Sequence, residues 1–266
     1  MKDDLGDRIK SNYENRSKTF LTRRIPVIIR VDGKSFSNFC KRFEKPHDQF
    51  LHDCLNNVML KICQEVQGAK FSERHSDEIS ILITDYDKET TDAYFDYEVQ
   101  KIVSVVASMA TAEFCRQLMR GNSGYSIGSS LIYDKLTLEE AWPTFDCRCF
   151  NIPENEISNY FYWRMLDAKR NSINMLAQTK FSHKQLQGVT CDEMQEMLFQ
   201  KHGINWAKLD QGQKTGYICL RKPEEYSIPN GPNKGVLVKR NKWNVDVSPS
   251  NIGNLRDIIS TVLCEK

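Results

Sequence analysis

The spacing of apolar positions predicts a core of strands and helices in the first part of the chain. A β-branched apolar run at 25–31 predicts a buried strand, and it stops at the turn signal Asp32-Gly33. Apolar residues recur at helical spacing over 50–66. A short extended run at 69–74 and a strong apolar run at 79–84 then predict a hairpin with a tip at Ser76-Asp77.

A second helix and a fourth strand complete this pattern. Helical spacing continues over 95–119, a Gly- and Ser-rich segment at 121–134 predicts a loop, and 145–152 predicts a strand. The order β-α-β-β-α-β is that of the split βαβ, or ferredoxin-like, arrangement, in which the first and third strands lie side by side and antiparallel. We therefore expect the carboxylates of Asp32 and Asp77 to meet at one edge of the sheet.

The rest of the chain has a more helical pattern. The sequence predicts helices at 5–20, 158–178, 182–188, 190–203 and 250–264, with short extended runs and turns between 204 and 244. The predicted fold class is α+β, a ferredoxin-like polymerase-type palm with an appended helical region. We expect a palm-like catalytic core at 1–152 and a helical and extended region at 153–266 packed on it as one compact unit.

Composition places the chain among ordinary globular proteins. Its 266 residues are 40% hydrophobic and 27% charged, and no run approaches the roughly 20 apolar residues of a membrane span. The first residues lack the apolar segment of a signal peptide, so we expect a cytoplasmic protein without a membrane partner. Nine cysteines without framework spacing and five histidines without a metal-binding pair argue against disulfides and zinc.

Charge is uneven although the net charge is only +2. Between 214 and 242 the chain has seven basic residues against two acidic ones. Such a patch can hold phosphates, and a solvated surface explains it equally well. The basic residues are Lys214, Arg221, Lys222, Lys234, Lys239, Arg240 and Lys242.

The two acidic strand ends have the chemistry of a magnesium site. Mg²⁺ is usually held by one or two carboxylates together with substrate phosphates. Asp32 and Asp77 supply carboxylates, Glu78 is a further candidate, and the Gly33 carbonyl adds an oxygen. Two such ions would clamp the attacking and leaving oxygens of a phosphoryl transfer, with Lys34, Lys41, Arg42 and Lys45 near in sequence to neutralise phosphates. Taken singly, each acidic turn is also an ordinary structural turn.

The motifs around these turns resemble the tRNA(His) guanylyltransferase family. They are Arg30-Val31-Asp32-Gly33-Lys34-Ser35-Phe36, the stretch 43–48, Ser76-Asp77-Glu78-Ile79-Ser80 and the helix segment 101–108. Later matches are Trp163-Arg164 with Asp167-Ala168, and Lys214-Thr215-Gly216. The motifs occur in order over about residues 5–220.

The resemblance implies a palm that extends RNA in the 3′→5′ direction. A tRNA 5′-monophosphate is activated with ATP or GTP, and the 3′-hydroxyl of a nucleoside triphosphate then attacks the activated end. Mg²⁺, expected as two ions, would be held by Asp32, Gly33 and Asp77, with Glu78 as a third catalytic carboxylate. Asp32, Gly33, Lys34, Ser35, Phe36, Ser37, Lys45, Asp48 and Ser76 would contact nucleotide. The family is typically homotetrameric.

Two departures bear on the RNA substrate. Ser37 stands where enzymes dedicated to histidine tRNA have histidine, and Lys169-Arg170-Asn171-Ser172 replaces their His-Ile-Asn-Asn. These changes favour the "-like" branch, which repairs 5′-truncated tRNAs by template-directed addition. We expect Lys169, Arg170, Asn171 and Lys214 to contact RNA. The alternatives are dedicated addition of a 5′ guanosine to histidine tRNA, a cyclase-like palm that acts without RNA, and a non-catalytic RNA-binding module.

Overall fold

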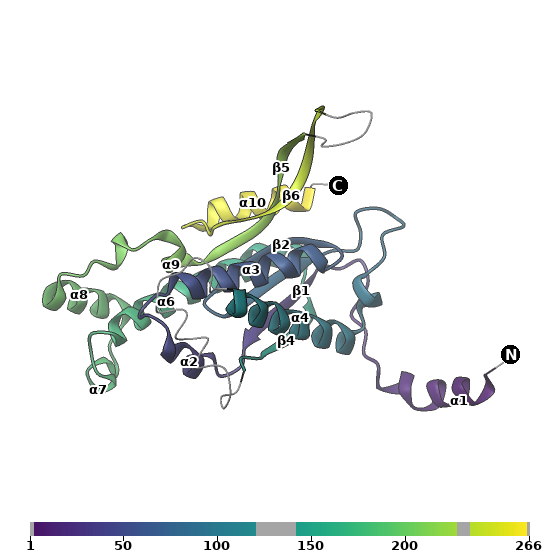
Figure 1. Ribbon diagram of the computed structural model, residues 1–266, viewed down its shortest axis with the longest axis horizontal. Coiled ribbons are helices and arrows are strands. Elements are labelled where there is room, and N and C mark those ends of the chain that lie inside the picture. Colours follow the sequence, from purple (N-terminus) through teal and green to yellow (C-terminus); the bar gives the residue numbers. More distant parts are fainter. Residues whose placement is uncertain (1–2, 121–141, 228–234, 265–266) are drawn as a thin grey trace.

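The fold is built on a six-stranded antiparallel sheet with helices on both faces (Figure 1). The computed structural model describes residues 3–120, 142–227 and 235–264. Its strands are β1 (Val27–Gly33), β2 (Ala69–His75), β3 (Glu78–Ile83), β4 (Phe145–Asn151), β5 (Tyr217–Ser227) and β6 (Leu237–Val247). The strand order is β4-β1-β3-β2-β5-β6, so the predicted antiparallel neighbours β1 and β3 are confirmed.

Helices connect and cover these strands. They are α1 (Asp4–Asn12), α2 (Phe36–Phe39), α3 (Gln49–Glu65), α4 (Val99–Arg120), α6 (Ile157–Gln178), α7 (His183–Leu186), α8 (Cys191–His202), α9 (Gln211–Thr215) and α10 (Ile252–Cys264). Local sequence sets their ends. The Thr190 hydroxyl and the Glu193 carboxylate form the predicted capping box of α8, and Gly203 ends that helix at φ 65°.

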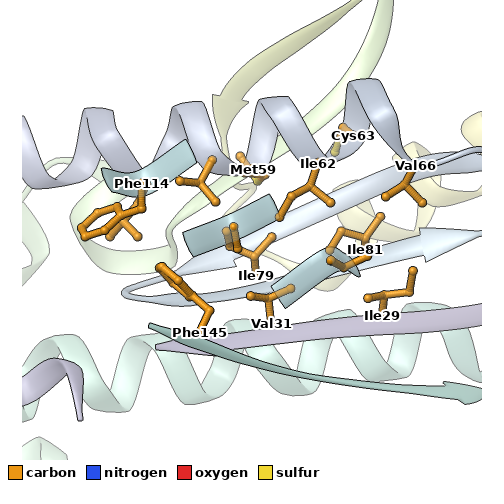
Figure 2. Packing of buried hydrophobic residues seen from close by; sticks show 14 of the residues in the cluster. Ile29, Val31, Met59, Ile62, Cys63, Val66, Ile79, Ile81, Phe114 and Phe145 are labelled. Atoms are coloured by element: carbon orange, nitrogen blue, oxygen red, sulfur yellow. The ribbon is translucent and has the colours of Figure 1, made fainter. Parts of the chain in front are cut away.

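One face of the sheet packs against α3 and α4. Alternate residues of β1 and β3 point to this face, as the period of two in a strand requires. Figure 2 shows Ile29, Val31, Ile79 and Ile81 beneath the α3 side chains of this core. The residues labelled there are Met59, Ile62 and Cys63 of α3 and Val66 just after it, and Phe114 and Phe145 close the end nearest Gly33, with which Phe145 pairs.

The other face packs against α6 and α10. Ile28, Phe71 and Leu82 of the sheet contact Phe161 of α6 and Leu255 of α10 in a second apolar cluster. The far half of α6 forms a third cluster with α7 and α8 at one end of the molecule (Figure 1). Because α6 spans both clusters, it ties this end of the molecule to the sheet.

The structure corrects two expectations about elements. The segment predicted as short extended runs contains β5 and β6, two strands of 11 residues each, and β5 pairs with β2. The helix predicted at 5–20 is shorter in the structure: it ends at Asn12, and a separate 3₁₀ turn follows at Glu14–Ser17. The predicted loop at 121–134 lies outside the described residues. The division at residue 152 stays a prediction.

Helix α4 corrects the statement that no stretch is long and apolar enough to span a membrane. In the described residues it is the one helix that meets this criterion, with a mean hydropathy of 1.2. Ile102, Val106, Ala110 and Phe114 nevertheless form a buried stripe against the sheet. The same length and composition are expected of a core helix in a mixed α/β fold.

Candidate active site

The pairing of β1 with β3 brings the two predicted acidic ends together. The register pairs Val31 with Ile79, and continued by two positions it sets Gly33 across from Asp77. Asp32 falls across from Glu78 in the same register. The geometric prediction that these strand ends meet is therefore confirmed.

Gly33 is the point of closest approach between the two strand ends. A Cβ atom built on Gly33 would lie 2.6 Å from the Asp77 Oδ2 atom and 2.3 Å from the Phe36 ring. Contacts below 3 Å are repulsive, so any side chain here would push the Asp77 carboxylate away. The carboxylate thus packs directly against the Gly33 backbone, which a side chain would prevent.

The electrostatics of the site favour a bound cation. Burial is the main cause that raises the pKa of Asp77 to about 6; the charges of Asp32 and Glu78 add to it, and hydrogen bonds from Ser76 and the Asp77 backbone oppose it. In the described ranges no group of three or more His, Cys, Asp or Glu side chains is arranged so that it could hold a metal ion by itself. Two carboxylates with the Gly33 carbonyl fit Mg²⁺, which takes its other ligands from phosphates and water.

Two arginines contact one oxygen of the Glu78 carboxylate. Its Oε2 atom accepts a hydrogen bond from Arg164 Nη2 at 2.6 Å and lies 3.1 Å from Arg30 Nη2. Burial raises the pKa of Glu78, and both arginines oppose that effect. The other oxygen, Oε1, is buried without a hydrogen-bond partner among the described residues. The arginines therefore orient the carboxylate and leave one oxygen free, and the catalytic role of Glu78 stays a prediction.

The residues of the loop after β1 that were predicted to contact nucleotide differ in their exposure. Lys34, Ser35 and Ser37 are exposed, and Ser35 adopts a left-handed φ of 55°. Phe36 is only 3% exposed, and its ring centroid lies 5.2 Å from that of Phe145. The Phe36 side chain is a core anchor, so any contact of this residue with nucleotide would be through its backbone.

Lys45 and Asp48 also differ in their surroundings. Lys45 is exposed. Burial, and then the charge of Asp77, raises the pKa of the Cys40 thiol to about 11, and the charge of Lys45 opposes this rise. Lys45 and Asp77 thus both lie near Cys40. Asp48 instead caps α3, because its carboxylate accepts hydrogen bonds from the backbone N–H groups of Leu51 and Glu44, each at 3.0 Å. The structure gives Asp48 a structural role that the sequence prediction did not include.

The predicted RNA contacts lie on two other elements. Lys169, Arg170 and Asn171 follow one another on α6, where the Lys169 ammonium donates to the Ser250 carbonyl at 2.8 Å and Arg170 pairs with Asp167. Asn171 is exposed. The Lys214 ammonium donates to the Ala207 carbonyl at 2.8 Å, so part of its hydrogen-bonding capacity is used inside the protein.

The sequence prediction missed two charged residues at this edge. Asp146 of β4 pairs directly with Asp32, and its carboxylate accepts a hydrogen bond from Arg148 at 2.8 Å. Arg74 of β2 is fully buried and donates to the Ser76 carbonyl at 2.6 Å. For Arg74 the sequence gives no distinguishing signal, since β2 also contains Lys70, Glu73 and His75. For Asp146 only the β1–β4 register reveals the proximity.

Comparison with known proteins identifies the family. A family model described as tRNAHis guanylyltransferase matches residues 6–153, more than half of the chain. The chain belongs to the tRNA(His) guanylyltransferase family. Members of this family are nucleotidyltransferases, and the chain is therefore an enzyme of this class.

Individual relatives agree with this assignment. A probable tRNA(His) guanylyltransferase of Dictyostelium discoideum is 27% identical over 219 residues, covering 76% of this chain and 78% of that protein. A bacterial tRNA(His) guanylyltransferase-like protein in complex with ATP is 36% identical, with a TM-score of 0.80, and the match covers 98% of this chain and all of that one. Its complex with GTP gives 35% identity and a TM-score of 0.76. The likeness places this guanylyltransferase in the "-like" branch.

The close approach at Gly33 gives a first prediction. Gly33→Ala should separate the Asp77 carboxylate from the β1 backbone and abolish nucleotidyl transfer, because the added Cβ overlaps Asp77 and Phe36. Gly253→Ala in α10 is the matched control, since its nearest contact would be 3.3 Å away, and it should keep full activity. Activity and thermal melting are measured for both. A fully active Gly33→Ala enzyme would contradict this account of the site.

The raised pKa of Asp77 gives a second prediction. The folded protein holds the Asp77 proton more tightly than the unfolded chain, so the contribution of this group to stability falls as pH rises from about 4 to about 6. Without metal, Asp77→Asn should therefore be more stable than the wild type at pH 7.5, by up to about 3 kcal/mol. The difference should vanish near pH 4 and shrink on adding Mg²⁺.

Denaturant unfolding across this pH range measures the difference in stability between Asp77→Asn and the wild type. Asp257→Asn, at an exposed position on α10, serves as the control and should show no such pH-dependent difference. A variant Asp77→Asn that is less stable than the wild type at pH 7.5 without metal would show that Asp77 is not electrostatically strained.

Proposed function

We propose that this guanylyltransferase-family member is a metal-dependent 3′→5′ nucleotidyltransferase that repairs 5′-truncated tRNAs by template-directed addition. The observation that carries the proposal is the Asp77 carboxylate, which packs against the Gly33 backbone next to Asp32, close enough for the charge of Asp32 to raise the pKa of Asp77. Converging carboxylates repel phosphate unless a cation lies between them. The arrangement therefore suits a site that brings nucleotide phosphates and metal together.

The first four strands serve as the platform. We propose that the β4-β1-β3-β2 part of the sheet, with α3 and α4 on one face, is a ferredoxin-like palm. Asp32, Asp77 and the Gly33 carbonyl would hold Mg²⁺, expected as two ions, and the bound Mg²⁺ would neutralise charge on the reacting phosphates. Lys34, Lys45 and the backbone of the loop after β1 would contact the nucleotide triphosphate.

The proposed reaction has two transfers. A phosphate oxygen of the tRNA 5′-monophosphate attacks the α-phosphorus of ATP or GTP, which forms a 5′–5′ anhydride and releases pyrophosphate. The 3′-hydroxyl of the incoming nucleoside triphosphate then loses its proton and attacks the activated 5′-phosphate, and the nucleoside monophosphate leaves. The bacterial relatives bound to ATP and to GTP support nucleotides of both kinds as substrates.

Residues 169–172 support repair over dedicated guanosine addition. Ser172 is buried, and its hydroxyl accepts a hydrogen bond from the Trp206 indole at 3.0 Å, so it acts inside the protein. Lys169 and Arg170 present positive charge that suits phosphate rather than a particular base. The second candidate, guanosine addition to histidine tRNA, is supported by relatives such as the Dictyostelium protein, which carries that name.

The β5–β6 ribbon is a further candidate RNA surface. It projects from the body of the molecule (Figure 1), and its exposed Arg221 and Arg240 lie over the rings of Trp243 and Tyr226, with the guanidinium carbons 4.9 and 4.8 Å from the ring centroids. Two of its lysines are less available, because Lys222 pairs with Asp246 and Lys242 pairs with Glu224, whereas Lys239 is exposed. We therefore propose that the two arginines, together with Lys239, provide most of the ribbon's affinity for RNA phosphates. The tetrameric state and cytoplasmic location stay predictions.

The proposed function predicts a specific product. With ATP, nucleoside triphosphates and Mg²⁺, the wild type should extend a 5′-monophosphorylated tRNA that lacks its first nucleotide, and Asp77→Ala should lose the extension. Gel analysis of 5′-end products makes the measurement. Wild-type protein that binds this tRNA but leaves it unextended would refute the proposal.

Base substitutions separate repair from guanosine addition. Changing the 3′-side base opposite the missing nucleotide should change which nucleotide is added, because the template base would select it. Addition of guanosine whatever the opposing base, and only to histidine tRNA, would instead support the second candidate. Several tRNAs truncated in the same way provide the comparison.

The ribbon gives a separate prediction for RNA binding. The double variant Arg221→Gln/Arg240→Gln should weaken tRNA binding and reduce the slope of log affinity against log salt by up to about 2, because each arginine would neutralise one phosphate. ATP affinity should stay unchanged. Filter binding at several KCl concentrations measures both the affinity and the slope.

The control removes a similar cation elsewhere. Lys201 of α8 is exposed and lies over the Phe181 ring at 5.7 Å, so Lys201→Gln removes a cation from a comparable aromatic contact. It should leave the slope unchanged. Equal losses of affinity in the double variant and in Lys201→Gln would mean that the ribbon has no special role.

A further inference from the structure

Arg74 stands out among the buried residues near the candidate site. It lies on β2, three positions before Asp77, and is only 1% exposed. A guanidinium removed from water is unfavourable unless the protein replaces its hydrogen bonds. Burial lowers the pKa of Arg74 to about 10, so it remains protonated at neutral pH. A buried cation at this place therefore needs a structural or functional reason.

The partners of Arg74 come from three different elements. Its Nη1 atom donates to the Ser76 carbonyl at 2.6 Å, and its Nε atom donates to Asn56 Oδ1 of α3 at 2.9 Å. Its guanidinium carbon lies 4.8 Å from the ring centroid of Tyr217 on β5. Arg74 thus links the tip of the β2–β3 hairpin to α3 and to β5.

His52 of α3 completes the contact as a neutral acceptor. Burial, followed by the charge of Arg74, lowers the pKa of His52 to about 3. Its Nδ1 atom lies 3.2 Å from Arg74 Nη2 and accepts the hydrogen bond, because a guanidinium can only donate. The guanidinium is therefore held by an amide oxygen, a ring nitrogen and a backbone carbonyl.

The hairpin tip that Arg74 holds is conformationally constrained. Ser76 adopts a left-handed φ of 51°, a region that residues with a side chain rarely occupy. The next residue, Asp77, must keep its carboxylate against Gly33, where the space is too small for a Cβ atom. A fixed Ser76 carbonyl fixes the peptide plane that leads into Asp77. The charge of Asp77 also raises the pKa of Arg74, so the two groups lie close enough to interact.

We propose that Arg74 is a positioning residue for the metal site. Its hydrogen bond to the Ser76 carbonyl fixes the Ser76–Asp77 turn, so that Asp77 meets a divalent cation together with Asp32. The inference rests on the proposed function, because that proposal assigns the cation to these carboxylates. It extends that function by naming the interaction that preorganises the ligand. Arg74 itself touches neither the nucleotide nor the metal.

Metal binding in the absence of a reaction tests the proposal. Mn²⁺ serves as the probe, because it also prefers oxygen ligands and its binding is measured by electron paramagnetic resonance. Arg74→Met keeps most of the side-chain volume and removes the charge and the three donated hydrogen bonds. It should weaken Mn²⁺ binding by about tenfold or more, as is typical when a metal ligand is deprived of its supporting partner. Arg74→Lys should fall between this variant and the wild type.

Two more variants separate positioning from general stability. Met59→Ala removes a fully buried side chain from α3 and should lower the melting temperature, yet leave Mn²⁺ affinity within about twofold of the wild type. Asn56→Ala removes one partner of Arg74 from a partly exposed position, so it should fold normally and weaken Mn²⁺ binding by a few-fold. The Asn56→Ala variant therefore tests the role of Arg74 even where Arg74→Met does not fold.

The outcomes distinguish this inference from the proposed function. Wild-type affinity for Mn²⁺ in Asn56→Ala, or in folded Arg74→Met, would overturn the role of Arg74. A weakening as large in Met59→Ala would also overturn it, since any destabilisation would then have the same effect. Wild-type protein that binds Mn²⁺ but adds no nucleotide would refute the proposed function alone. Wild-type protein that binds no Mn²⁺ would overturn the inference.

Discussion

The antiparallel register of β1 and β3 is the constraint on which the candidate site depends. It sets Gly33 across from Asp77 and Asp32 across from Glu78, although the two strands are separated by α3 and β2 in the chain. A slip of one residue would turn Asp32 to the opposite face of the sheet, because side chains alternate with a period of two. The apolar residues of both strands prevent this slip, since Ile29, Val31, Ile79 and Ile81 are all buried in one core (Figure 2).

The carboxylates around this register are only partly compensated within the protein. Glu78 has Arg164 and Arg30 as partners for its Oε2 atom, whereas its Oε1 atom is buried without a partner in the described part of the chain. Asp77 has hydrogen bonds from Ser76 and from its own backbone N–H, and burial still raises its pKa. Burial likewise raises the pKa of Glu78 in spite of its two arginines. These buried carboxylates beside Asp32 are a physical reason to assign a cation to this edge of the sheet.

The sequence predicted the elements of the core because each one carries a periodic apolar pattern. The strand and helix positions from 25 to 120 agree with the structure to within a few residues, and so does the meeting of Asp32 with Asp77. Individual roles were harder, because a motif names a residue and does not state where its side chain points. Phe36 belongs to the nucleotide-loop motif, yet its ring packs against Phe39, Phe114 and Phe145.

The residues missed by sequence analysis depend on long-range contacts. Arg74 is explained only by Asn56, His52 and Tyr217, which no local pattern relates to it. The 11-residue strands β5 and β6 were predicted as short runs because Pro223 and several charged residues interrupt their alternation. Their pairing with each other and with β2 supplies the stability that the local sequence does not indicate.

Helix α6 connects the charged site to the proposed RNA contacts. Arg164 reaches Glu78 from this helix, and Asp167 one turn later pairs with both Arg164 and Arg170. Arg170 lies six positions after Arg164, which corresponds to about 9 Å along the helix axis. The same helix is anchored on the sheet through Phe161, which is fully buried and packs edge-to-face against Phe71 of β2. RNA bound at Arg170 would therefore be held at a fixed distance from the strand ends, because the helix that carries the contact cannot move independently of β1 and β3.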